Sequence, residues 1–251
     1  MAVAFSPYTK QWEGNQLPFW NSYSLQDVKD MLNVVNSKFT YIATYSMGVA
    51  SYNKDKPWDQ ADSSCLVPRA AAQINREKSQ LALKVAQGVY QNEDQSLQQK
   101  EIDNAFSAAQ DANGIFGNTV WGLVFTNEYF TNEGTGNRIL SMIRDNKQRA
   151  RQLGLKVGTR IHVCGQIMNS GPMREVLANI VRESDFIMCN LYPDNNVVNS
   201  GIENAVQAVG NAYKSYLPKF KVSYFELAYP NFQNYIFILP RYRKSIQISM
   251  L

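Results

Sequence analysis

Two glutamates could do chemistry together, because each closes an apolar run of the kind that forms a buried strand. Glu128 ends the segment Trp121-Gly-Leu-Val-Phe-Thr-Asn-Glu128, and Glu226 ends Phe220-Lys-Val-Ser-Tyr-Phe-Glu226. A retaining glycosidase uses two carboxyl groups held roughly 5 Å apart, one as proton donor and one as nucleophile. The sequence therefore predicts a catalytic pair, with Glu128 as general acid and base and Glu226 as nucleophile.

Each glutamate also has a plainer interpretation. Glu128 could be a solvated loop acid, and Glu226 could be a buried acid in a structural ion pair. Glu133 is a rival to Glu128, but it lies beyond the apolar run, in an expected loop. Strand alternation supports Glu226, since it shares one strand face with Tyr224 and can point into a site while Phe225 faces away.

The elements that must position these acids follow from the alternation of short apolar runs with amphipathic stretches. This alternation predicts βα units and a parallel sheet. We expect strands near 2–7, 39–46, 81–89, 120–127, 155–163, 185–191 and 220–226. We expect helices near 24–36, 66–79, 95–112, 135–153, 171–182 and 201–216, with Ser24, Ser96 and Ser200 near helix starts and Gly154 after a helix.

Repeated βα units of this spacing favour closure into a single α/β domain, a (β/α)8 TIM-type barrel spanning 1–251. The eighth unit is short or atypical. Only Asn234-Tyr-Ile-Phe-Ile-Leu239 is left for a last strand, and a basic tail follows from Arg241.

Polar and aromatic side chains stand at the ends of the predicted strands, where a barrel gathers its functional residues. They include Tyr8, Tyr45, Asn127, His162, Tyr192 and Tyr229. Amides and tyrosines suit an uncharged polyhydroxylated ligand, since its hydroxyls need donors and acceptors and its ring faces stack on aromatic rings. We therefore expect these side chains to bind a sugar, with Asn127 hydrogen-bonding its 2-hydroxyl.

Some of these residues have a second interpretation. His162 could hydrogen-bond the nucleophile or a sugar, or it could be a satisfied histidine in the barrel wall. Tyr192 could orient the nucleophile through its hydroxyl, or it could pack beside a turn at Pro193. Three loop tryptophans could stack on sugars or anchor their loops: Trp12, Trp20 and Trp58.

Composition and motifs exclude other functions. The net charge of +4 is spread over 25 basic and 21 acidic residues, so no basic block predicts a nucleic-acid partner. No apolar stretch is long enough for membrane insertion, and no signal peptide is expected at Met1. Three cysteines and one histidine predict no metal site or disulfide scaffold, phosphate-binding glycine motifs are lacking, and no cofactor is expected.

Five segments resemble glycoside hydrolase family 17, the β-1,3-glucanases and glucanosyltransferases. In chain order they are Ala2-Val-Ala-Phe-Ser-Pro-Tyr-Thr9, Thr40-Tyr-Ile-Ala-Thr-Tyr-Ser46, Trp121 to Glu128, Asp185-Phe-Ile-Met-Cys-Asn-Leu-Tyr-Pro193 and Glu226-Leu-Ala-Tyr-Pro-Asn231. The resemblance implies a (β/α)8 barrel with the acid/base on Glu128 of the fourth strand and the nucleophile on Glu226 of the seventh. It also implies a β-glucan substrate, β-1,3-linked, and an extracellular or cell-wall location.

The chain departs from the family pattern at three places. Ala43 stands where the family has an arginine, Leu227-Ala-Tyr replaces Thr-Gly-Trp, and the segment after Pro230 does not resemble the family's last strand and helix. These departures leave open a barrel that is catalytically weak or inactive and acts as a secreted glycan-binding or signalling protein. The sequence does not separate hydrolysis from transglycosylation, and it does not give the oligomeric state.

Overall fold

The computed structural model describes residues 2–7, 23–162, 171–191 and 236–240, together with isolated residues between 196 and 215. One sheet contains all its strands, every neighbouring pair is parallel, and the strand order follows the chain order. The strands are β1 (Ala2–Ala4), β2 (Tyr41–Ala43), β3 (Lys84–Val89), β4 (Val120–Asn127), β5 (Lys156–His162), β6 (Phe186–Leu191) and β7 (Ile236–Pro240).

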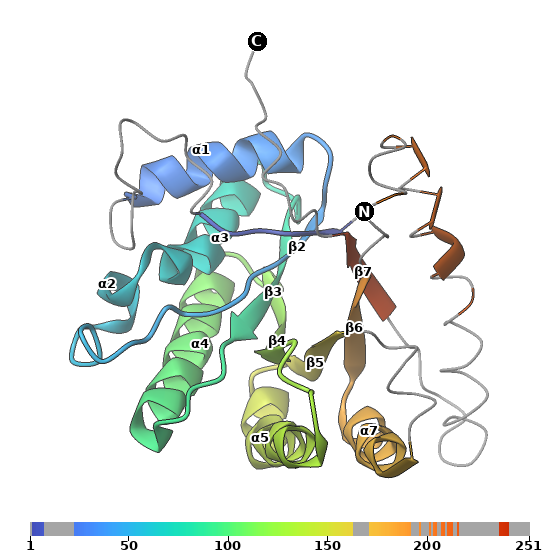
Figure 1. Ribbon diagram of the computed structural model, residues 1–251. Coiled ribbons are helices and arrows are strands. Elements are labelled where there is room, and N and C mark those ends of the chain that lie inside the picture. The colour runs from blue at the N-terminus through green and yellow to red at the C-terminus, as the bar shows by residue number, and fades with distance from the viewer. Residues whose placement is uncertain are drawn as a thin grey trace.

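Helices follow the strands and lie around the outside of the sheet (Figure 1). They are α1 (Leu25–Asn36), α2 (Trp58–Ala61), α3 (Val67–Glu77), α4 (Gln95–Ile115), α5 (Glu133–Gln152) and α7 (Gly171–Glu183), with a short 3-10 helix at Ser63–Leu66. The described residues at 203, 204, 207, 208, 210–212 and 215 are also helical, inside the helix expected over 201–216.

The sequence prediction is confirmed for β1 to β6, each of which lies within one of the predicted runs. β7 overlaps the last strand expected at 234–239, but its place in the sheet differs from the prediction. The predicted strand 220–226 lies outside the described residues, and β7 pairs directly with β6 through Ile187 and Ile236 and onward to Leu191 and Pro240. β7 also comes close to β1, so the sheet curls round on itself. The described fold is therefore α/β with a curled parallel sheet, whereas the complete eight-unit barrel stays a prediction.

Two apolar layers follow from the alternation of side chains along each strand. On the outer face of β4, Leu123 and Phe125 join the large core cluster that the helices complete. On the inner face, Val124 packs in a smaller cluster with Phe186 and Met188 of β6. Both faces of the sheet are thus covered, which explains why its strands read as nearly continuous apolar runs.

Within the inner layer, the centre of the Phe186 ring lies 4.7 Å from the centre of the Trp121 ring. A Cβ atom at Gly158 would lie 2.3 Å from the Phe186 carbonyl oxygen and 2.6 Å from its ring. Gly158 is therefore required for this close approach of β5 and β6.

Local sequence sets the helix ends. Ser24 caps α1 and accepts from Asp27 N, as the sequence predicts, and Gly154 follows α5 with φ +68°. The cap of α4 is Asp94, not Ser96, because the Asp94 carboxylate accepts from the backbone of Ser96 and Leu97. In the part of the chain that the structure describes, no helix combines the length and apolar character needed to cross a bilayer.

Candidate functional site

Glu128 follows the last residue of β4, at the carboxyl end of the sheet. Its backbone N–H donates to the Arg160 carbonyl at 2.9 Å, so the pairing with β5 continues through this residue. Its φ of +54° lies in the left-handed region, which is uncommon for a residue other than glycine. Such strained backbone concentrates at functional sites, where the surrounding structure holds it.

The Glu128 carboxylate is held by the next two strands. Asn190 Nδ2 donates to Glu128 Oε1 at 2.6 Å, and His162 Nδ1 lies 3.6 Å from the same oxygen. His162 and Asn190 are register partners on β5 and β6, so both side chains point to the inner face of the curled sheet. The Glu128 side chain is 21% exposed, so part of it is accessible at the carboxyl ends of β4, β5 and β6, which form the mouth of the curled sheet.

This arrangement suits proton transfer. A carboxyl group can donate a proton to a leaving group and later remove one from an incoming hydroxyl, provided that neighbouring groups fix its orientation. The amide of Asn190 supplies a fixed donor, and the imidazole of His162 supplies a second polar neighbour on the same oxygen.

A second layer of polar groups lies beneath Glu128, inside the sheet. Arg160 is fully buried on β5, and its Nη1 donates to Asn127 Oδ1 at 3.2 Å. Its Nη2 donates to the Thr44 carbonyl at 3.1 Å, and its guanidinium carbon lies 4.9 Å from the centre of the Tyr45 ring. Arg160 of β5 thus places a guanidinium beside Tyr45. Position 43 of β2 supplies no guanidinium, because the residue there is alanine.

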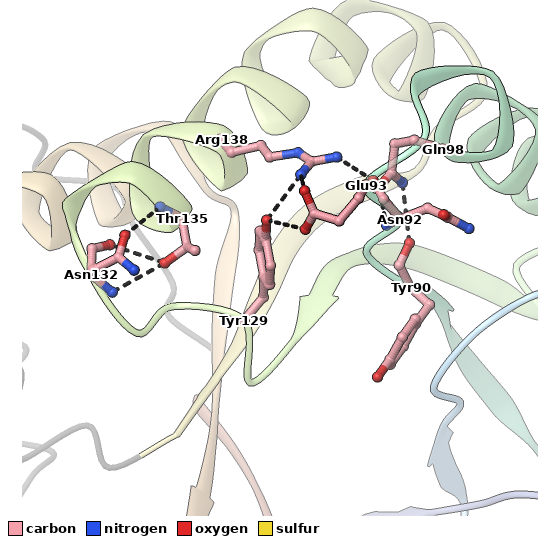
Figure 2. Close-up of polar contacts among 8 residues, drawn as sticks. All are labelled: Tyr90, Asn92, Glu93, Gln98, Tyr129, Asn132, Thr135 and Arg138. Atoms are coloured by element: carbon pink, nitrogen blue, oxygen red, sulfur yellow. Dashed lines mark hydrogen bonds and ion pairs between the residues drawn. The ribbon is translucent and has the colours of Figure 1, made fainter.

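The loop that carries Glu128 is fastened to the loop after β3 (Figure 2). The Tyr129 hydroxyl donates to Glu93 Oε1 at 3.0 Å, while Arg138 Nη1 donates to Glu93 Oε2 at 2.8 Å and to the Tyr129 oxygen at 3.0 Å. Arg138 Nη2 also donates to the Asn92 carbonyl. These bonds, first those from Arg138 and then that from Tyr129, lower the pKa of Glu93.

Glu101 of α4 fastens the loops after β2 and β3 from inside the protein. Its carboxylate accepts from Met47 N at 2.6 Å, Val49 N at 2.9 Å and Tyr90 N at 2.9 Å. Burial raises the pKa of Glu101 to about 7, although the three backbone donors act in the opposite direction. The loops after β2 and β3 are therefore held by a carboxyl group whose pKa is raised to about 7.

The predicted site residues fall into two groups. At the carboxyl ends of β2, β4 and β5, the structure brings His162 close to Glu128 and joins Asn127 and Tyr45 through Arg160. The predicted residues Tyr8, Tyr192, Glu226 and Tyr229 lie outside the described residues.

Two of the other candidates have structural roles. Glu133 is the exposed first residue of α5, where an acid interacts favourably with the helix dipole, so it does not share the position of Glu128. Trp58 begins α2 and packs against the core, and the guanidinium carbon of Arg69 lies 4.8 Å from the centre of its ring. These contacts support the interpretation of Trp58 as a loop anchor. Trp12 and Trp20 lie outside the described residues.

The sequence-based interpretation assigned no role to Asn190 or Arg160, which the structure brings into contact with Glu128 and Asn127. Strand alternation could have indicated Arg160, because it lies two residues before His162 and therefore shares the same strand face. Among the described residues, no cluster of three or more His, Cys, Asp or Glu side chains could hold a metal ion. Cys65 is a buried free thiol, and Cys189 is disulfide-bonded.

The chain matches no protein-family model and no curated protein sequence.

Proposed function

We propose that this protein is a retaining glycoside hydrolase or transglycosylase that acts on β-glucan, with β-1,3 linkages as the substrate. The proposal rests on one observation: at the carboxyl ends of β4, β5 and β6, Asn190 donates a hydrogen bond to the Glu128 carboxylate and His162 lies close to the same oxygen. Enzymes built on parallel strands that curl into a barrel place their catalytic residues at these ends.

In the proposed reaction, protonated Glu128 gives its proton to the glycosidic oxygen as the bond to the anomeric carbon breaks. The carboxylate of Glu226 attacks that carbon and forms a glycosyl ester. Glu128, now ionised, takes a proton from water or from a sugar hydroxyl, and the resulting oxygen displaces Glu226. Water gives hydrolysis, and a sugar hydroxyl gives transfer.

The mechanism requires Glu226 to face Glu128 across roughly 5 Å. We therefore also propose that residues 220–226 form a further strand that completes a (β/α)8 barrel and brings Glu226 to the carboxyl ends of the other strands. Because β7 already pairs with β6, this strand would not take the position beside β6. The substrate would lie against the amide of Asn127 and the ring of Tyr45, with Tyr8, Tyr192 and Tyr229 as further contacts.

An extracellular or cell-wall location belongs to the same proposal. The disulfide bond of Cys189 supports it, since disulfides persist in oxidising compartments.

The second candidate function is a glycan-binding or signalling protein without catalysis. Two observations favour this second function. Ala43 stands where glycoside hydrolase family 17 has an arginine, and β7 pairs directly with β6, so the described end of the sheet departs from an eight-unit barrel. In that case the mouth would hold a glucan chain without cutting it.

Incubation with laminarin, a soluble β-1,3-glucan, tests the proposal. We expect reducing sugar or transfer products from the wild type, and a loss of at least a hundredfold in kcat for Glu128→Gln and for Glu226→Gln. Glu133→Gln is the matched control, because it makes the same change at the exposed start of α5 and should retain full activity. Binding without turnover in the wild type would favour the second function, and neither binding nor turnover would refute both.

A further inference from the structure

Arg160 is the largest fully buried side chain in the described part of the chain. A buried guanidinium is costly unless its charge is met by hydrogen bonds and aromatic faces. Arg160 makes such contacts at two different strand ends. It donates to Asn127 Oδ1 at the end of β4, and beyond the end of β2 it donates to the Thr44 carbonyl and lies over the Tyr45 ring. One side chain thus ties together two residues that the proposed function assigns to sugar binding.

The contact with Asn127 fixes the polarity of its amide. A guanidinium has only N–H donors, so it selects the oxygen of the amide and turns the NH2 group away from itself. Asn127 is half-buried, and among the residues that the structure describes its Nδ2 has no hydrogen-bond partner. The group that Asn127 offers to a ligand is therefore a donor.

We infer that Arg160 is a positioning residue which fixes Asn127 as a hydrogen-bond donor to a sugar hydroxyl and holds the Tyr45 ring beside it. This inference rests on the proposed function and deepens it, because it names the polarity of the contact. A sugar that presents an acceptor oxygen to Asn127 binds, and one that lacks an oxygen there loses the contact.

The sharpest test changes the polarity of Asn127 without removing its bond to Arg160. Asn127→Asp keeps an acceptor for the guanidinium but has no N–H to offer. Asn179→Asp is the matched control, since Arg182 Nη1 donates to Asn179 Oδ1 at 2.6 Å on the exposed face of α7, away from the site. Affinity for laminarihexaose, measured by calorimetry in the Glu226→Gln background to prevent turnover, is the readout, with the melting temperature of each variant beside it.

We expect Asn127→Asp to retain the wild-type melting temperature within a few degrees and to lose about tenfold or more in affinity. Asn179→Asp should change neither. Unchanged affinity of Asn127→Asp, in a protein that otherwise binds laminarihexaose, would overturn the inference and leave the proposed function standing. No affinity of the parent protein would instead refute the proposed function, and the inference with it.

Arg160→Met supplies a second readout. If Arg160 acts through Asn127, then Asn127→Ala should cost about tenfold in affinity when Arg160 is present and less than about twofold in the Arg160→Met background. Independent roles would make the two losses multiply, which contradicts the inference. Should Arg160→Met fail to fold, the Asn127→Asp comparison still decides it.

Discussion

The side-chain amide of Asn190 donates to Oε1 of Glu128 across 2.6 Å. Because an amide N–H can only donate, Oε1 must accept. This bond disfavours a proton on Oε1, so we expect the proton that Glu128 carries in the proposed mechanism to reside on Oε2. Under the proposed function, Asn190 on β6, two strands away from β4, would then select the oxygen that delivers the proton to the substrate.

Removal of the Asn190 amide should therefore impair the chemical step. For Asn190→Ala we expect kcat on laminarin to fall about tenfold to a hundredfold with little change in KM, because Glu128 loses its fixed orientation. Steady-state kinetics at several laminarin concentrations measure the split. Asn179→Ala on α7 serves as control, and an unchanged kcat for Asn190→Ala would show that the hydrogen bond is not part of the catalytic arrangement.

The buried carboxyl of Glu101 should make stability depend on pH. Its pKa in the folded protein is raised to about 7 from 4.5, so the folded state keeps a proton that the unfolded state releases earlier. The stabilising contribution of this group is fully present below about pH 4.5 and is lost as pH rises to about 7, with a maximal change of about 3 kcal/mol.

Denaturant unfolding of the wild type and of Glu101→Gln between pH 4 and 8 measures this effect. The free energy of unfolding of the wild type, minus that of the variant, should fall as pH rises across this window, because glutamine does not titrate. Parallel curves for the two proteins would contradict the raised pKa.

The bonds among Arg138, Glu93 and Tyr129 should affect activity more than stability. Loss of an exposed ion pair costs little stability, but Tyr129 adjoins Glu128 in the chain, and a loosened loop would misplace the acid. We expect Arg138→Met to lower kcat/KM about tenfold with a change in melting temperature of only a few degrees.

Arg144→Met is the matched control for this prediction. Arg144 lies on the same helix, and its Nε is 3.2 Å from Glu183 Oε1 of α7. It lies beyond the first turn of α5, away from the loop that carries Glu128. It should leave kcat/KM unchanged. Equal effects of the two substitutions would assign Arg138 to general helix stability rather than to the loop that carries Glu128.

The first six strands could be predicted from the sequence because parallel strands covered on both faces leave short, nearly continuous apolar runs. Glu128 could be found for the same reason, since it directly follows such a run. The end of the sheet is different: two apolar runs, 220–226 and 234–239, compete for the position beside β6, and local sequence carries no information on which of them pairs there.

Arg160 and Asn190 show why part of the site escaped prediction. An arginine is among the residues least often buried, so its place in the interior comes from tertiary partners that only the fold supplies. Asn190 is significant because β6 places it opposite Glu128, 62 residues away in the chain. Strand alternation gives the face of each residue, whereas the curl of the sheet decides which side chains meet.

Covalent trapping tests the central claim most directly. A 2-deoxy-2-fluoro β-laminaribiosyl fluoride should acylate the nucleophile and stay attached, since the 2-fluorine slows release of the ester and fluoride leaves without a proton donor. Peptide mass spectrometry should then find one sugar on Glu226 in the wild type and in Glu128→Gln, and none in Glu226→Gln. A label on another residue, or laminarin cleavage without any label, would contradict the assignment of Glu128 and Glu226 as acid and nucleophile.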